Sequence, residues 1–233
     1  MNSIKKLSER VLYEDNHLII INKLPSEIVQ GDKTGDAPLS GAVKAYIGQK
    51  FNKPGNVFLG VTHRIDRPVS GAVIFARTSK ALTRLNEMFK AGNIQKKYLA
   101  VVSNSPPTAS GHLVHFLKKN EKQNKSYPHK EGTLGAKRAE LKYQLIGRSD
   151  KYFLLEVELL TGRHHQIRAQ LSAAGCPIKG DLKYGFDRPN KDGSIHLHAR
   201  SVEFTHPVSK TYLKIMAPLP ADDVLWLHFH KMI

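Results

Sequence analysis

The length, composition and charge of this chain exclude several classes of protein. It has 233 residues, 40% of them hydrophobic, which is enough for a buried core in one large domain or two small ones. Its apolar runs are far shorter than the roughly 20 residues of a membrane span, and its N-terminus lacks the apolar stretch of a secretory signal. A single cysteine, Cys176, excludes an intrachain disulfide, so we expect a cytoplasmic protein with no membrane partner.

The charge indicates a class of partner. There are 36 Lys and Arg against 20 Asp and Glu, for a formal net charge of +16. Such an excess attracts polyanions, because each phosphate contact releases counterions and the long-range field speeds encounter. Nucleic acid is therefore the leading partner, although a basic surface that only contacts solvent has the same composition. The single tryptophan and the scattered Tyr and Phe form no stacking motif for single strands.

The first half of the chain alternates short strands with two helices. Alternating and continuous apolar runs predict strands at residues 11–13, 18–22 and 72–76, and helical spacing predicts a helix at 39–51. A second helix begins at Ser79, its expected N-terminal cap, and ends at Gly92.

The second half is richer in strands. Apolar patterns predict strands near residues 98–102, 139–146, 152–160, 196–205 and 212–216, a helix at 164–174 and a short C-terminal helix. Residues 118–135 have almost no apolar content, and we expect a mobile loop or hairpin tip there, a possible contact for RNA. Strands dominate without strict alternation with helices, which favours an α+β fold around a mixed or antiparallel sheet.

Two polar stretches interrupt this pattern. VTHRIDRPVSGAVIFART, residues 61–78, places His63, Arg64, Asp66 and Arg67 in a turn before a buried strand. LLTGRHHQIRAQLSAAGCPIKGDLKYG, residues 159–185, places Arg168 at the edge of an apolar helical stripe. A guanidinium in that position needs a carboxylate partner. Asp66 is an attractive candidate, and a routine pair with a nearby acid is the alternative.

Other motifs for catalysis are missing. The histidines at 164–165, 196 and 198, and 228 and 230 have no cysteine or carboxylate at metal-ligand spacing, so we predict no metal site. There is no phosphate-cradling loop, nucleophile elbow or deaminase signature, so we expect no cofactor.

The same stretches resemble a known family. HRIDRPVSG resembles the HRLD-x-x-TSG motif of the RluA family of pseudouridine synthases, and KKYLAVV resembles its K-x-YLA segment. TGRHHQIRAQLSAAGCPIKGDLKYG is similar to TGRTHQIR-x-H followed by G-x-PI-x-GD-x-x-YG. LHA at 197–199, HP at 206–207 and APLP at 217–220 follow in the family's order. The resemblance runs from about Val11 to Pro220.

This resemblance implies an activity and residues that carry it. It implies a catalytic Asp66, an active-site Tyr98 and an Arg168 that pairs with the aspartate. It also implies that Arg64 replaces the flipped uridine in the stack. We expect the basic residues beside these motifs to contact RNA: His63, Arg67, Arg163, His164 and His165. His164, Gln170 and Val69 depart from the family pattern, which affects substrate contacts rather than the catalytic groups.

The resemblance further implies a pseudouridine synthase fold, with a bent, mainly antiparallel mixed sheet, flanking helices and a central active-site cleft. We expect residues 1–233 to form one catalytic domain without a separate N-terminal RNA-binding module. The expected partner is structured RNA, either rRNA or tRNA, with no obligate protein partner and a monomeric state.

Two other functions fit parts of the sequence. A catalytically silent RNA-binding or ribosome-assembly factor would keep the fold and the charge, but it would be free to lose Asp66, Tyr98 and Arg168. A nucleoside glycosidase would need a second carboxylate as general acid, and only Asp181 is available in the two stretches.

Overall fold

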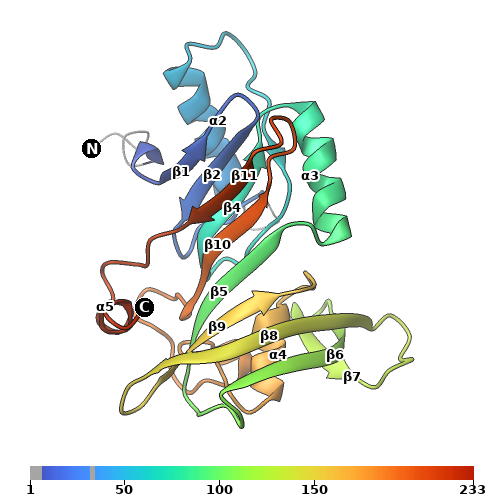
Figure 1. Ribbon diagram of the computed structural model, residues 1–233, viewed down its shortest axis with the longest axis vertical. Helices are drawn as coiled ribbons and strands as arrows, with labels where there is room; N and C mark the ends of the chain where they lie inside the picture. The colour runs from blue at the N-terminus through green and yellow to red at the C-terminus, as the bar shows by residue number, and fades with distance from the viewer. Residues whose placement is uncertain (1–6, 32–34) are drawn as a thin grey trace. The chain divides into compact units, whose positions relative to one another are not determined.

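The structure is a computed structural model that describes residues 7–31 and 35–233. The chain divides into two compact units. The first contains the residues up to Ile94 together with Ala199–Pro218, and the second contains Gln95–His198 together with Leu219–Ile233. Each unit combines antiparallel strands with helices, so the predicted α+β class is confirmed (Figure 1).

The sheet of the first unit is built from strands that read as apolar runs in the sequence. In order across the sheet, these are β1 (Val11–Glu14), β2 (Leu18–Lys23), β4 (Ser70–Ala76) and β10 (Leu197–Thr205). β3 (Gly60–Val61) pairs with β4, and β11 (Tyr212–Met216) pairs with β10. Every residue of β4 is buried, as expected for a strand that carries neighbours on both edges.

Helices α2 (Leu39–Lys50) and α3 (Ser79–Ala91) accompany this sheet (Figure 1). The prediction that Ser79 caps α3 was wrong by one residue. Thr78 has the extended backbone of an N-cap, and its hydroxyl accepts the N–H of Ala81 at 3.2 Å. Gly92 ends α3 in the left-handed conformation, as predicted. The apolar face of α3 packs with β2, β4 and β10 in one buried core.

The strands of the second unit pair antiparallel in an order that differs from their order in the chain. Their order is β5 (Gln95–Val102), β9 (Phe153–Leu159), β8 (Lys137–Arg148), β6 (Ser110–Asn120) and β7 (Lys125–His129). Helix α4 (Gln166–Ala173) packs against β6 and β7, the turn η1 (Leu182–Tyr184) follows it, and α5 (Val224–His230) lies near the C-terminus. Trp226 and Phe229 of α5 join the buried residues Leu99, Val101 and Leu154.

The polar segment 118–135 forms an ordered hairpin tip rather than a mobile loop. β6 continues to Asn120, and β7 returns from Lys125 in register with it. The sequence offered both outcomes, and composition could not choose between them. The strands pair through backbone N–H and C=O groups. A lysine-rich sequence has the same backbone groups as an apolar one.

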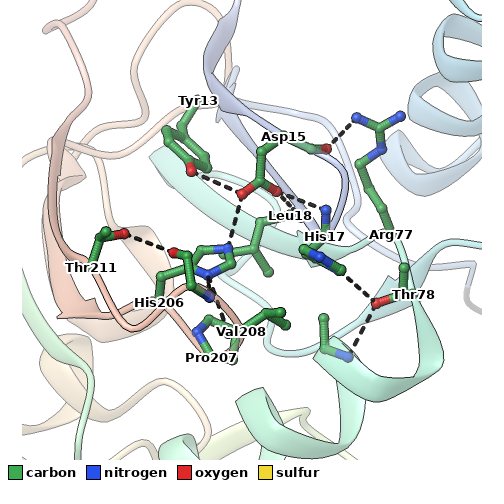
Figure 2. A network of polar contacts seen from close by, with 12 residues as sticks. Tyr13, Asp15, His17, Leu18, Arg77, Thr78, His206, Pro207, Val208 and Thr211 are labelled. Atoms are coloured by element: carbon green, nitrogen blue, oxygen red, sulfur yellow. Dashed lines mark hydrogen bonds and ion pairs between the residues drawn. The ribbon is translucent and has the colours of Figure 1, made fainter.

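A polar network joins the β1–β2 turn to the β10–β11 turn (Figure 2). Asp15 accepts the backbone N–H groups of His17 and Leu18, each at 2.7 Å, and the hydroxyl of Tyr13 at 2.9 Å. Fully buried His206 accepts the N–H groups of Val208 and Ser209 through Nδ1. Its Nε2 lies 3.0 Å from the Asp15 carboxylate, off the line of a well-aligned hydrogen bond.

This network predicts that the folded state is sensitive to acid. Burial lowers the pKa of His206, although Asp15 opposes this, so protonation below about pH 6.5 favours the unfolded chain. Burial would raise the pKa of Asp15, but its hydrogen bonds from His17, Leu18 and Tyr13 and the nearby His206 outweigh burial and lower it. The stability contributed by Asp15 is present above its unfolded pKa and is lost as the pH falls below it.

We therefore expect His206→Asn to lower the free energy of unfolding by about 1–3 kcal/mol at pH 7.5, since buried hydrogen bonds are lost. Between pH 7.5 and 5.5 the variant should lose less stability than the parent, because one neutral buried histidine has been removed. Urea unfolding at both pH values measures this, with exposed His228→Asn as the control. An equal loss in parent and variant would contradict the assignment.

None of the helices within residues 7–31 and 35–233 is both long and apolar enough to cross a bilayer.

Candidate active site

Two side chains attach the His63–Arg67 turn to β4. They belong to the residues that follow β3, and they bond the backbone of β4 beyond the last β3–β4 pair. The hydroxyl of Thr62 donates to the carbonyl of Ile74 at 2.7 Å, and Nε2 of His63 accepts the N–H of Ile74 at 2.9 Å. The ring of His63 lies 4.7 Å from that of Phe89 on α3. His63, predicted to contact RNA, therefore has an anchoring role within its own unit.

Asp66 begins a tight turn whose backbone carbonyls accept hydrogen bonds from within the turn and from β2 and the segment after it. Its carbonyl accepts the N–H of Val69 at 3.0 Å, and Pro68 inside the turn restricts φ. The carbonyl of Arg67 accepts the N–H of Ser26 at 2.9 Å and the ammonium of Lys23 at 3.0 Å. These bonds fix the Arg67–Pro68 peptide next to Asp66, whose own side chain is half-buried.

Lys23 is the polar residue that the sequence analysis missed in this unit. Its side chain is fully buried at the end of β2 and also donates to the carbonyl of Leu24 at 2.8 Å. Burial lowers the pKa of Lys23 to about 7, while Glu27 and Asp66 act in the opposite direction. The carboxylate of Asp66 thus lies within the electrostatic range of a buried amine in its own unit.

The two arginines of the turn are exposed to solvent. Arg64 is exposed, and its contact with RNA stays a prediction. Arg67 is exposed and forms an ion pair with Asp36, which is itself 55% exposed. An exposed pair of this kind contributes little to stability, so Arg67 can exchange its partner for a phosphate at small cost.

In the second unit, a network of side chains fixes the turn before α4. Oε1 of Gln166 accepts the N–H of Arg163 at 2.9 Å and the hydroxyl of Thr161 at 2.8 Å, while its Nε2 donates to the carbonyl of Glu140. His165 takes a left-handed conformation, φ 52°, immediately before the helix. The predicted start at His164 was therefore wrong, because the turn bonds require non-helical backbone there.

Arg168 has the carboxylate partner that its position requires. It is 5% exposed, and its Nε and Nη2 donate to the two oxygens of Asp181 at 2.7 and 2.8 Å. Asp181 is 1% exposed, so both charges are removed from water and compensate each other. The inference that Arg168 needs an acid is confirmed, and the acid seen here is Asp181. A pairing of Arg168 with Asp66 stays a prediction.

Tyr184 lies under the same guanidinium, whose carbon is 5.0 Å from the ring centroid. Its hydroxyl accepts the N–H of Ser126 at 2.8 Å and lies 3.0 Å from Nδ1 of His165. Burial and the nearby Arg168 lower the pKa of His165 to about 2, so this ring is neutral at physiological pH. His165 thus supports the Arg168 region rather than carrying charge to RNA.

Two residues of this unit differ from the family pattern, His164 and Gln170, and both contact neighbouring strands. His164 stacks on His165 at 3.8 Å between ring centroids, and its Nδ1 lies 2.9 Å from the hydroxyl of Ser126 in β7. Nε2 of fully buried Gln170 lies 3.1 Å from each of the carbonyls of Leu113 and Ala139. Both residues therefore connect α4 or its entry turn to the β6–β8 strands.

Tyr98 lies in β5, opposite Val157 of β9, and is 7% exposed. Asp66 and Arg64 belong to the first unit, whereas Tyr98, Arg163, His164, His165 and Arg168 belong to the second. Lys23 and Tyr184 were not singled out from the sequence, because a single polar residue gives no periodic signal. The only sequence signals near them are short: Asn22-Lys23 at the end of a strand, and Lys183-Tyr184-Gly185 after a turn.

A family model described as RNA pseudouridylate synthase matches residues 17–173. A ribosomal large subunit pseudouridine synthase C of Vibrio vulnificus is 31% identical over 225 residues, covering 94% of this chain and 68% of the relative. The protein of the same name from Buchnera aphidicola is 34% identical over 229 residues, covering 95% and 71%.

Solved structures show the same fold. Human RNA pseudouridylate synthase domain containing 4 has a TM-score of 0.80 at 22% identity, with 98% of this chain and 95% of that chain covered. Human RNA pseudouridylate synthase domain containing 1 has a TM-score of 0.72 at 22% identity, with 94% and 86% covered.

These matches show that the chain belongs to the RNA pseudouridine synthases. It is an isomerase that acts on RNA. Within that class it is a member of the RluA family, as the motifs predicted.

Proposed function

We propose that this protein converts a specific uridine of large-subunit ribosomal RNA into pseudouridine. The observation that carries the proposal is the match, over more than nine-tenths of the chain, to relatives named ribosomal large subunit pseudouridine synthase C. A tRNA substrate, which the sequence left equally open, has no such support. The net charge of +16 suits either RNA.

Asp66 is the proposed catalytic carboxylate. The reaction breaks the bond between N1 of uracil and C1′ of ribose, rotates the base, and forms a bond from C5 to C1′. A carboxylate can attack C1′ as a nucleophile, or it can remove the 2′ proton to give a glycal. When C5 bonds to C1′, it displaces the carboxylate in the first route, and in the second route the 2′ proton returns to C2′. The base then loses its C5 proton and N1 gains one, so the reaction is an isomerisation without redox change. The fixed backbone of the 66–69 turn supports this role, because a reacting group must be held in place.

Three other side chains complete the proposed machinery. Arg168 keeps the catalytic carboxylate ionised, and Asp181 holds its guanidinium in one orientation through two hydrogen bonds. Tyr98 stacks on the base and accepts the C5 proton. Arg64, which is exposed, occupies the space that the flipped uridine leaves in the RNA.

The remaining proposals concern the whole molecule. We propose that the described units together form one catalytic domain, that the protein acts as a monomer in the cytoplasm, and that it requires no cofactor. Its RNA contacts come from the basic residues of the two motif regions, Arg67 and Arg163 among them. Both of these side chains are exposed.

Modification mapping tests the choice of RNA. Transcribed large-subunit rRNA fragments and tRNA are incubated with the protein, and pseudouridine is located by chemical labelling and primer extension. We expect product at a defined position of the rRNA alone. Product only in tRNA would overturn the rRNA assignment. Binding without product in any RNA would favour the silent factor, and release of free uracil would favour the glycosidase.

A further inference from the structure

The hairpin arm, residues 118–138, carries a disproportionate share of the charge of the chain. It contains seven Lys or Arg against two Asp or Glu, a net +5 of the total +16. One of the two acids, Glu121, pairs with Lys119. The basic residues of the arm are Lys118, Lys119, Lys122, Lys125, Lys130, Lys137 and Arg138.

Most lysines of the arm are exposed, including the three at positions 118, 122 and 130. Lys118, Lys122 and Lys130 are exposed, and within residues 7–31 and 35–233 no carboxylate lies at ion-pair distance from any of them. Lysines that have no acidic partner keep their full charge for an external anion, because no internal ion pair has to be broken first.

The arm holds this charge on an ordered frame. The ammonium of Lys183 donates to the carbonyls of Gln123 and Asn124 at 3.3 and 3.1 Å, and the hydroxyl of Tyr127 donates to Gln123 at 2.6 Å. Asn120 accepts the N–H of Gln123 at 3.2 Å. A preformed display of charge binds a phosphate backbone at lower entropic cost than a disordered tail would.

The arm is also joined to the region of Arg168. Its strand β7 packs against α4, and Ser126 bonds to both Tyr184 and His164. The ring of Tyr184 has the ammonium of Lys125 on it at 5.0 Å and the guanidinium of Arg168 at 5.0 Å. An RNA bound on the arm is therefore held relative to the helix that carries Arg168.

We propose that this arm is an RNA-binding surface, which contacts the phosphate backbone of the substrate outside the nucleotide that is isomerised. This inference rests on the proposed function for its substrate but concerns binding rather than chemistry. The rigid connection through Ser126 and Tyr184 lets those phosphate contacts align the RNA with Arg168.

The test compares two triple variants with the same change in charge. The first replaces Lys118, Lys122 and Lys130 with Ala. The control replaces Lys44, Lys80 and Lys90, which are exposed on α2 and α3, with Ala. Affinity for a fluorescent rRNA fragment that contains the modified site is measured from 50 to 300 mM salt, and thermal unfolding confirms that each protein is folded.

We expect the arm variant to bind about ten-fold more weakly or worse at 150 mM salt, and the control to stay within about two-fold of the parent. The plot of log K against log salt has a negative slope, and its magnitude should decrease by about 2 in the arm variant. Each lost phosphate contact removes roughly 0.7–0.9 from that magnitude. Its KM should rise while kcat at saturating RNA is retained.

Equal affinity and slope in the arm and control variants would overturn the proposal, as would equal weakening of both. A second arm variant, with Glu at the same three positions, should bind still more weakly, and unchanged binding there would also overturn it. Wild-type protein that binds the RNA but forms no pseudouridine would contradict the proposed function and leave the arm assignment to be judged by these affinities.

Discussion

Breaking the buried pair between Arg168 and Asp181 should lower the free energy of unfolding by several kcal/mol and abolish isomerase activity. Arg168→Met leaves a carboxylate that is 1% exposed without its bidentate partner, and Asp181→Leu leaves the guanidinium buried instead. Removal of one member of a buried pair costs roughly 3–5 kcal/mol, because the remaining charge is neither hydrated nor compensated. Urea unfolding of both single variants measures this loss.

The double variant, Arg168→Met with Asp181→Leu, separates stability from catalysis. Two apolar side chains replace two buried charges, so we expect a free energy of unfolding much closer to that of the parent than in either single variant. Activity should stay lost, because Arg168 is the proposed partner of the catalytic carboxylate. Lys50→Met is the control: it removes a pair with Glu14 in which the lysine is 47% exposed, and it should cost less than about 1 kcal/mol.

Two results would contradict this account. Destabilisation of the double variant by the sum of the single losses would mean that the two charges do not compensate each other. Wild-type activity in the stable double variant would show that Arg168 has a structural role alone.

A second large effect is expected at Gly71, the residue that leads from the His63–Arg67 turn into β4. Its φ is +113°, a region that side chains avoid, and its backbone lies against Ala199 of β10. A Cβ there would overlap the Ala199 carbonyl oxygen and lie 2.6 Å from its nitrogen. Gly71→Ala should therefore cost roughly 3 kcal/mol or more, because two backbones have to separate and one has to change conformation.

The matched control is Gly41→Ala in α2. A Cβ at position 41 meets only Pro38 at 3.8 Å, an ordinary contact, and alanine is favoured over glycine inside a helix. We expect the control to gain about 0.5–1 kcal/mol while Gly71→Ala loses stability, both by urea unfolding. Equal stability of parent and Gly71→Ala would show that the approach of β4 to β10 tolerates a methyl group.

The periodicity of apolar residues predicted most of the elements, and the reasons for its errors are local. Strands β2 and β4 were found because nearly all of their residues are buried and apolar, and β9 because its buried residues Leu154, Leu155 and Val157 are apolar. The caps were less predictable: Thr78 and Ser79 are chemically equivalent, and only the backbone conformation selects Thr78. The hairpin at 118–135 depends on backbone pairing that its polar side chains do not reveal.

The candidate site was predictable in part. Physical reasoning showed that Arg168 needs an acid, but the choice of Asp181 depends on how the turn after α4 folds, which spacing does not specify. Lys23 was missed because burial of a lysine contradicts its usual preference for solvent, and only the carbonyls of Leu24 and Arg67 make it possible. The motifs identified Asp66 and Tyr98 by resemblance, not by geometry.

The most direct test of the central claim is the rate of pseudouridine formation by Asp66→Asn on the rRNA fragment that the parent modifies. Asparagine has the same shape without the charge, so the fold and RNA affinity should be preserved while the rate falls by about three orders of magnitude or more. Exposed Asp187→Asn should keep the parental rate. A folded Asp66→Asn protein that forms pseudouridine at the parental rate would contradict the account.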